Sequence, residues 1–283
     1  LAKRLLTAGN GTYNFIKDDE NLTSLPFSKF EDRCDAVLDA LREAEQTTGK
    51  KKLYLCNVTH SSIDTMLNRA HRIKDHGGIC MMMDVVVTGF AALHSMRLKN
   101  PGLAIHAHRA MHAFITRDSG SGIGGDGSLS GFSVSMVVLA KIYRMLGVDS
   151  LHSGSPKAKM EDYGESEVIA DLLMTDSTKP NDRFHTLGQE WFGMKKVWPV
   201  ASGGLHPGVL DRVYEKFGPN CYIQFGGGVL GHPKGAARGV EAAIEARTCC
   251  VAHIPILQYT KDHPESALAE AVTLWGTEPK IVY

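Results

Sequence analysis

The stretch YNFIKDDE, residues 13–20, contains the pattern that decides the fold. Its first half is rich in aromatic and β-branched residues, as strands are, and its second half is a run of charged side chains. A helical pattern follows over about residues 29–48. The same order of short apolar run, polar residues and longer amphipathic stretch then recurs along the chain.

Seven such strand–helix units are predicted, and a helical remnant over residues 1–8 precedes the first. The expected strands cover residues 13–16, 52–57, 78–84, 104–108, 150–152, 198–201 and 221–225. The expected helices cover residues 29–48, 62–75, 89–99, 132–146, 165–174, 208–217 and 235–247. This alternation implies an α/β fold with a parallel sheet and right-handed crossovers. It predicts a TIM (β/α)8 barrel that lacks its first strand, with a doubly wound open sheet as the alternative.

Composition limits the classes of function. The chain has 283 residues, 43% of them hydrophobic, and its 31 basic residues balance its 31 acidic residues. This balance argues against a nucleic-acid or membrane-surface role, and no apolar run or signal peptide points to a membrane. Six cysteines without metal-finger spacing indicate reduced core thiols of a cytoplasmic protein.

The chain begins in what looks like the middle of a helix, so we expect a fragment. Residues 119–131 and 175–189 look irregular, and the second stretch resembles an insertion.

The charged run combines a lysine with two carboxylates. Asp19 and Glu20 offer the hard oxygen ligands that Mg²⁺ prefers. An ammonium at Lys17 would repel a cation, but a carbamate formed from its amine and CO₂ would be an anionic oxygen ligand. The simpler interpretation is a solvated loop with an ion pair between residues three positions apart.

Every predicted strand ends in polar residues, which is where a parallel barrel places its active site. These residues are Lys17, Asp19, Glu20, Asn57, Thr59, Asp84, His106, His108, Arg109, His112, His152, Ser153, Lys157, Lys159, Ser202, His206 and His232. Each one alone has a structural explanation, since His106 or His112 can be a hydrogen-bonded core histidine and Asn57 can cap a turn. Together they favour a single active site at the carboxyl ends of the strands, which we call the mouth of the barrel.

Glycine runs follow the last two predicted strands, at 203–204 and 226–228. Backbone amides in such turns commonly bind phosphate at this position of a barrel, although tight turns alone also explain them. Arg109, His152 and Lys159 lie on other loops and are suited to a second anionic group. Two phosphate sites predict a bisphosphate substrate.

The motifs resemble those of the large subunit of RuBisCO, ribulose-1,5-bisphosphate carboxylase/oxygenase. The matching stretches are NFIKDDE (14–20), HAHRAMHA (106–113), HSG with KME (152–161), VASGGLHPG (200–208) and QFGGGVLGHP (224–233). The last two are most similar to the archaeal form III and form II/III enzymes. The resemblance covers residues 1–283 as the C-terminal barrel domain only. It implies carboxylation and oxygenation of ribulose 1,5-bisphosphate, with CO₂ and O₂ as co-substrates, by a homodimer or higher homo-oligomer.

The resemblance also implies roles for individual residues. Lys17, as its CO₂ carbamate, would bind Mg²⁺ with Asp19 and Glu20 and serve as the base for enolisation. His108 would act in later proton transfers, and Lys159 would stabilise the new carboxylate. The residues implied to bind substrate are Arg109, His152, Ser202, Gly203, Gly204, Gly226 and Gly227.

Three features depart from the family pattern. The first barrel strand, with its catalytic lysines, and the N-terminal α+β domain are not present in the chain, so we expect this chain alone to be inactive. The loop around Lys159 has Ala158 and Asp162 where the family usually has glycine. The alternatives are a RuBisCO-like enolase or isomerase acting on a sugar phosphate, and a truncated barrel without catalytic activity.

Overall fold

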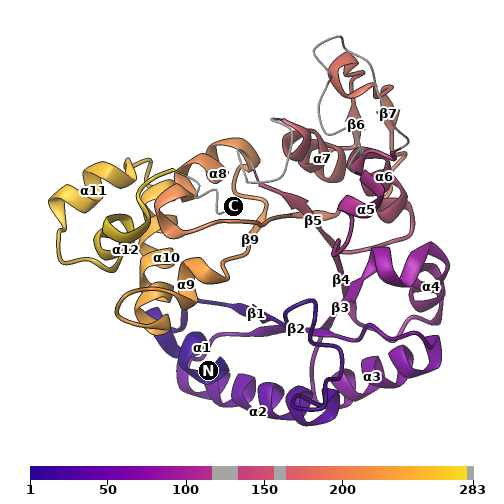
Figure 1. Cartoon of the computed structure of the whole chain (residues 1–283), viewed down its shortest axis with the longest axis horizontal. Helices are drawn as coiled ribbons and strands as arrows, with labels where there is room; N and C mark the ends of the chain where they lie inside the picture. The colour runs from indigo at the N-terminus through magenta and orange to yellow at the C-terminus, as the bar shows by residue number, and fades with distance from the viewer. Residues whose placement is uncertain (117–132, 156–163, 279–283) are drawn as a thin grey trace.

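A curved parallel sheet forms the centre of the protein (Figure 1). The computed structural model describes residues 1–116, 133–155 and 164–278. Within these ranges the sheet has seven strands in the order β1-β2-β3-β4-β5-β8-β9. The strands are β1 (Phe15–Lys17), β2 (Leu53–Asn57), β3 (Cys80–Asp84), β4 (Ala104–His108), β5 (Ser150–Gly154), β8 (Trp198–Ala201) and β9 (Tyr222–Ile223). Neighbours in space are neighbours in sequence, so the order never reverses as it does in a doubly wound sheet. The prediction of a partial barrel is confirmed.

Helices surround the outside of the curved sheet (Figure 1). Those that follow or precede the strands are α1 (Ala2–Gly11), α2 (Phe30–Thr48), α3 (Ile63–Asp75), α4 (Val85–Lys99), α6 (Met136–Met145), α7 (Glu165–Met174), α8 (Leu210–Phe217) and α10 (Ala236–Val251). The largest group of buried apolar side chains lies between the sheet and the helices α1–α4, α6 and α7. A second group joins α8 and α10 to the C-terminal helices α11 (Ile256–Asp262) and α12 (Ala267–Trp275).

The sheet is open between β1 and β9. Among the described residues, β1 pairs only with β2, and β9 pairs only with β8. The two edges still come close at the amino-terminal ends of β1 and β9, where the ring centroids of Phe15 and Tyr222 lie 5.3 Å apart. Outside this opening α1 packs against α10. A pocket of about 340 Å³ is lined by residues of both edges, of α1 and of the loop after β1.

Several predicted boundaries differ from the structure. The helix expected over 132–146 begins at Met136, because the Ser135 side chain accepts a hydrogen bond from Val138 N and caps it. The stretch 175–189 is not irregular: β6 (Ser177–Thr178) and β7 (Gln189–Glu190) form an antiparallel pair that projects from the body (Figure 1). The sequence pattern also missed α5 (Ala113–Thr116), α9 (Gly227–Leu230), α11 and α12. Residues 119–131, expected to be irregular, lie outside the described residues.

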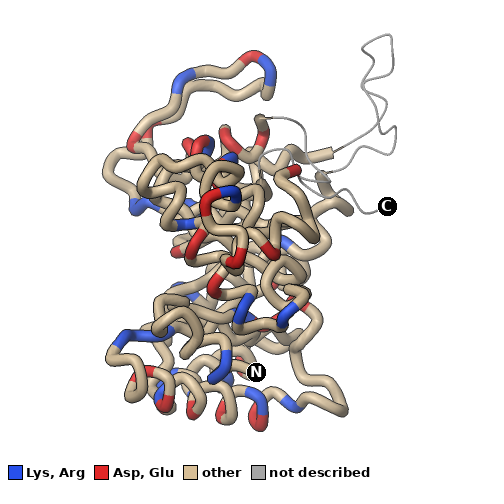
Figure 2. Tube along the Cα trace, turned by 90° about the vertical axis from the view of Figure 1, so that its left-hand side faces the viewer, with Lys and Arg blue, Asp and Glu red and all other residues tan. Residues whose placement is uncertain are grey.

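Charge and cysteine placement agree with the composition. Lys and Arg alternate with Asp and Glu along the trace (Figure 2). All six cysteines are free, and every one except Cys221 is buried. No described helix combines the length and apolar character needed to cross a bilayer.

Candidate active site at the carboxyl ends of the strands

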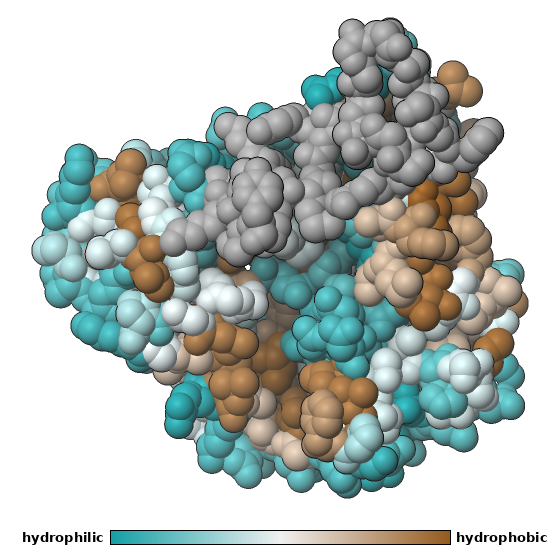
Figure 3. All heavy atoms as spheres, in the orientation of Figure 1, coloured by the Kyte–Doolittle hydropathy of each residue, from teal (hydrophilic) through white to brown (hydrophobic). Residues whose placement is uncertain are grey.

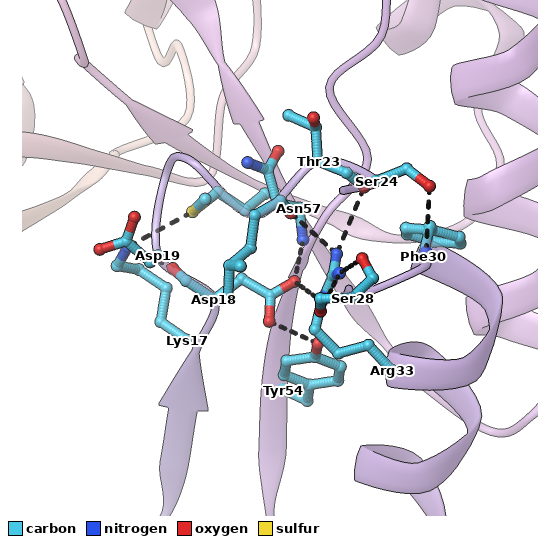
Figure 4. Close-up of polar contacts among 12 residues, drawn as sticks. Lys17, Asp18, Asp19, Thr23, Ser24, Ser28, Phe30, Arg33, Tyr54 and Asn57 are labelled. Atoms are coloured by element: carbon cyan, nitrogen blue, oxygen red, sulfur yellow. Dashed lines mark hydrogen bonds and ion pairs between the residues drawn. The ribbon is translucent and has the colours of Figure 1, made fainter. Parts of the chain in front are cut away.

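Lys17 ends β1 with its side chain at the mouth of the half-barrel (Figure 4). Its amine donates a hydrogen bond to Asp18 O at 2.5 Å and lies 3.9 Å from Glu20 Oε2. Burial lowers the pKa of Lys17, although the carboxylates of Glu20 and Asp19 act in the opposite direction. The Asp19 side chain accepts hydrogen bonds at 2.9 Å from the backbone and side-chain nitrogens of Asn21. An amine whose pKa is lowered by burial therefore lies beside two carboxylates.

Asn57 and Asp84 connect this loop to the next strands. Asn57 is buried at the end of β2, and its side-chain nitrogen donates to Glu20 O at 3.1 Å and to Asp84 Oδ2 at 3.0 Å. The other oxygen of Asp84 lies 3.3 Å from His108 Nδ1. Glu20 Oε2 lies 3.6 Å from Nε2 of the same imidazole. His108 is thus held between two carboxylates from two different strand ends.

Three buried histidines pack together beside this group. The rings of His108 and His152 are 4.2 Å apart, and those of His106 and His152 are 4.9 Å apart. Burial lowers the pKa of His106 and His152 well below the ordinary value, and neighbouring positive groups add to the effect. Both imidazoles are therefore neutral near pH 7.

Ser202 and the glycine turns form the opposite side of the mouth. Ser202 Oγ lies 2.9 Å from His152 Nδ1. Gly203 and Gly204 have φ of +102° and +65°, a region in which other residues are strained. A Cβ built on Gly203, Gly226 or Gly227 would meet no described atom within 4 Å. These turns therefore face open space.

Arg109 is buried directly after β4, and burial lowers its pKa to about 10, so it stays cationic at neutral pH. Its charge contributes to the low pKa of His152, which shows that the two groups are near each other. Lys157 and Lys159 lie outside the described residues. Among the described residues the structure brings together Lys17, Glu20, Asn57, Asp84, His106, His108, His152 and Ser202 without testing their roles.

Three predicted strand-end histidines serve the scaffold instead. His206 Nε2 is 3.0 Å from Glu278 O, and His232 Nε2 is 3.1 Å from Ala267 O. The Nδ1 atom of His112 is 3.0 Å from the hydroxyl of Thr116. These contacts attach the C-terminal segment and α5, and they explain the three residues without any catalytic role.

Comparisons with known proteins identify the family of the chain. The family model described as ribulose bisphosphate carboxylase large chain, catalytic domain, matches residues 2–275. The chain belongs to this RuBisCO family. Ribulose bisphosphate carboxylase of Methanosarcina acetivorans is 39% identical over 268 residues, covering 94% of this chain. That of Methanocaldococcus jannaschii is 44% identical over 250 residues, covering 87%.

Solved archaeal RuBisCO structures share the fold. The dimeric enzyme of Hyperthermus butylicus superposes with a TM-score of 0.85 at 37% identity, over 98% of this chain and 61% of that one. The octameric enzyme of Pyrococcus horikoshii, in complex with sulfate, gives a TM-score of 0.81 at 36% identity, over 97% of this chain and 59% of that one. The chain spans about 60% of the length of the curated RuBisCO from Methanosarcina.

Proposed function

We propose that this chain is the barrel domain of a carboxylase that converts ribulose 1,5-bisphosphate and CO₂ to 3-phosphoglycerate, with O₂ as the competing substrate. The observation that carries the proposal is the convergence of Lys17, Glu20, His108, His152 and Ser202, from four different strand ends, on one mouth. Structural residues have no reason to cluster in this way at the catalytic end of a barrel.

The donor set at β1 fits Mg²⁺. No cluster of three His, Cys, Asp or Glu side chains suited to a metal occurs in the described part of the chain. Two carboxylates and an amine of lowered pKa are present, and addition of CO₂ to the neutral amine of Lys17 would supply the third oxygen ligand. Asp19 and Glu20 complete the set. When bound, the metal supplies a Lewis acid that polarises the oxygens of the substrate.

His108 is suited to move a proton at Nε2. Its Nδ1 accepts a hydrogen bond from Ala110 N at 3.2 Å, so the neutral imidazole carries its proton on Nε2. This Nε2 proton lies on the side of the proposed metal ligand Glu20, whose Oε2 is 3.6 Å from Nε2. An imidazole with its proton on Nε2 can donate that proton to a group bound at the mouth, as a general acid does.

Two groups of residues would hold the two phosphates. Arg109 supplies a buried cation, and His152 Nε2 is buried without a hydrogen-bond partner among the described residues. If the Ser202 hydroxyl donates to His152 Nδ1, Nε2 carries a proton that a phosphate oxygen can accept. On the other side, the turns at 203–204 and 226–227 leave room for an anion against backbone amides. Lys159, outside the described residues, is proposed to stabilise the new carboxylate.

The functional unit is proposed to be a homodimer or a larger homo-oligomer. The solved relatives are described as dimeric and octameric. An apolar patch lies over α4–α6 on the face shown in Figure 3. Its exposed members are Val87, Phe90, Met111, Phe114, Val134 and Val138. Patches of this kind commonly mark contacts between proteins.

Incorporation of radiolabelled CO₂ tests the proposal. The chain should be joined to a first strand and an N-terminal domain taken from an archaeal relative, and compared with the chain alone. We expect bisphosphate-dependent fixation only by the joined protein, because removing members of a unit that acts together costs far more than each alone suggests. Equal activity in both would show that the added parts are dispensable. Enolisation of the substrate without fixation would favour the RuBisCO-like isomerase, and inactivity of both would favour a non-catalytic barrel.

A further inference from the structure

Asp18 lies in the middle of the charged loop but faces away from the mouth (Figure 4). It is 5% exposed, and its carboxylate accepts hydrogen bonds from Tyr54 Oη at 2.6 Å, Asn57 N at 3.0 Å and Arg33 Nε at 3.1 Å. Tyr54 and Asn57 belong to β2, and Arg33 belongs to α2. One buried carboxylate therefore joins the loop to both the sheet and the helical layer.

Arg33 extends this attachment along the loop between β1 and α2. Its guanidinium donates to Leu22 O at 2.8 Å and to Ser28 O at 3.1 Å, besides its contact with Asp18. A planar guanidinium has five donors in fixed directions, so it defines the relative positions of its acceptors. Asn57 adds a bond to Glu20 O. The path of the loop is thus set by side chains behind it.

The direction of Asp18 determines the direction of its neighbours. Asp18 N donates to Leu55 O at 3.1 Å, so the backbone continues the extended path of β1 beside β2. Successive side chains of an extended backbone point to opposite sides. Because Asp18 points toward Arg33 and Tyr54, Lys17 and Asp19 point toward the mouth, as Figure 4 shows.

We propose that Asp18 is a positioning residue for the divalent-cation site. Its carboxylate, held by Arg33 and Tyr54, keeps Lys17 and Asp19 in the orientation in which they bind the metal. The inference rests on the proposed function, because it concerns the same ligands, and it assigns Asp18 no contact with metal or substrate. Residues behind a metal's ligands typically change affinity about 10- to 100-fold when they are lost.

The test is bicarbonate-dependent Mn²⁺ binding by the full 283-residue chain, followed by the electron paramagnetic resonance signal of free Mn²⁺. Asp18→Ala should weaken binding about tenfold or more. Asp18→Asn should recover part of that loss, because an amide can still accept from Asn57 N and donate to the Tyr54 hydroxyl. The matched control is Asp35→Ala, which removes a carboxylate of α2 that is paired with Arg72 of α3 and should leave binding unchanged.

Hydrogen exchange gives a readout independent of metal. The amides of Asn21 and Leu22 bond to Asp19 Oδ1 and Asp19 O, so they report on the loop. Both should exchange faster in Asp18→Ala than in Asp35→Ala. If Asp18→Ala does not fold, the Tyr54→Phe variant tests the proposal instead. It removes only the 2.6 Å hydrogen bond from Tyr54 Oη to Asp18 and should weaken Mn²⁺ binding measurably.

The outcomes separate the two proposals. A wild-type chain without bicarbonate-dependent Mn²⁺ binding would refute the metal site of the proposed function, and the inference with it. A wild-type chain that binds, with Asp18→Ala binding equally well, would overturn only the inference. Weaker binding by Asp18→Ala without faster exchange at Asn21 and Leu22 would also overturn it, because the effect would then not pass through the loop.

Discussion

Replacing Arg33 by methionine should destabilise the protein strongly. The side chains of Arg33 and Asp18 are only 10% and 5% exposed, and their ion pair spans 3.1 Å. Removing one partner of a buried pair typically costs about 3–5 kcal/mol, because the other charge stays buried. We therefore expect Arg33→Met to lower the free energy of unfolding by about 3–5 kcal/mol in urea denaturation followed by circular dichroism.

A second pair, between Asp35 of α2 and Arg72 of α3, provides the control. Arg72 bonds to Asp35 through two nitrogens, but these side chains are 37% and 33% exposed. Solvent screens such pairs, so Arg72→Met should cost about 0–1 kcal/mol. Adding Asp18→Asn to Arg33→Met should recover part of the loss, since the unpaired charge is then gone. Equal losses in Arg33→Met and Arg72→Met would refute the reasoning from burial.

Three further predictions concern activity, measured in the chain joined to a first strand and N-terminal domain. Lys17→Ala should abolish CO₂-dependent activation and lower carboxylation by several orders of magnitude. In the joined protein with Lys17 intact, activation by CO₂ should rise with pH as the amine loses its proton. Near-parental activity of the Lys17→Ala variant would contradict the metal assignment. Gly227→Ala should keep the melting temperature but raise KM for the bisphosphate. Gly228→Ala should instead lower the melting temperature, because its Cβ would lie 2.3 Å from Leu205 O. The opposite pattern would contradict the proposed phosphate site at these glycines. Replacing Ala158 and Asp162 by glycine should change turnover or CO₂/O₂ partitioning, since glycine frees the backbone of a closing loop; unchanged kinetics would place the hinge elsewhere.

The periodic part of the fold was predictable from sequence because each strand–helix unit buries one apolar run and one amphipathic face. Helix α2, for example, was expected over 29–48 and is observed over Phe30–Thr48. The small elements were not predictable in this way. The β6–β7 pair lacks an apolar alternation, and α11 and α12 pack on α8 and α10 rather than on the sheet. Their stability depends on tertiary contacts that local patterns do not record.

The site residues were predictable as a set, since polar residues at strand ends must share one edge of a parallel sheet. The contacts that these residues make with one another were harder to predict from the sequence. Asn57 and Asp84 were found only as strand ends, and their link between Glu20 and His108 required the structure. Asp18, Arg33 and Tyr54 were missed as a group. A charged run gives no sign of which carboxylate faces inward, and Arg33 is fifteen residues away in sequence.

The opening between β1 and β9 leaves two strand edges that a separate peptide could pair with. Each remaining strand is held by its own neighbour and helix, and α1 packs on α10 across the outside of the opening. A strand supplied as a separate peptide would therefore meet two prearranged edges without rearrangement of the other walls. The closure of the sheet would then depend on the concentration of that peptide.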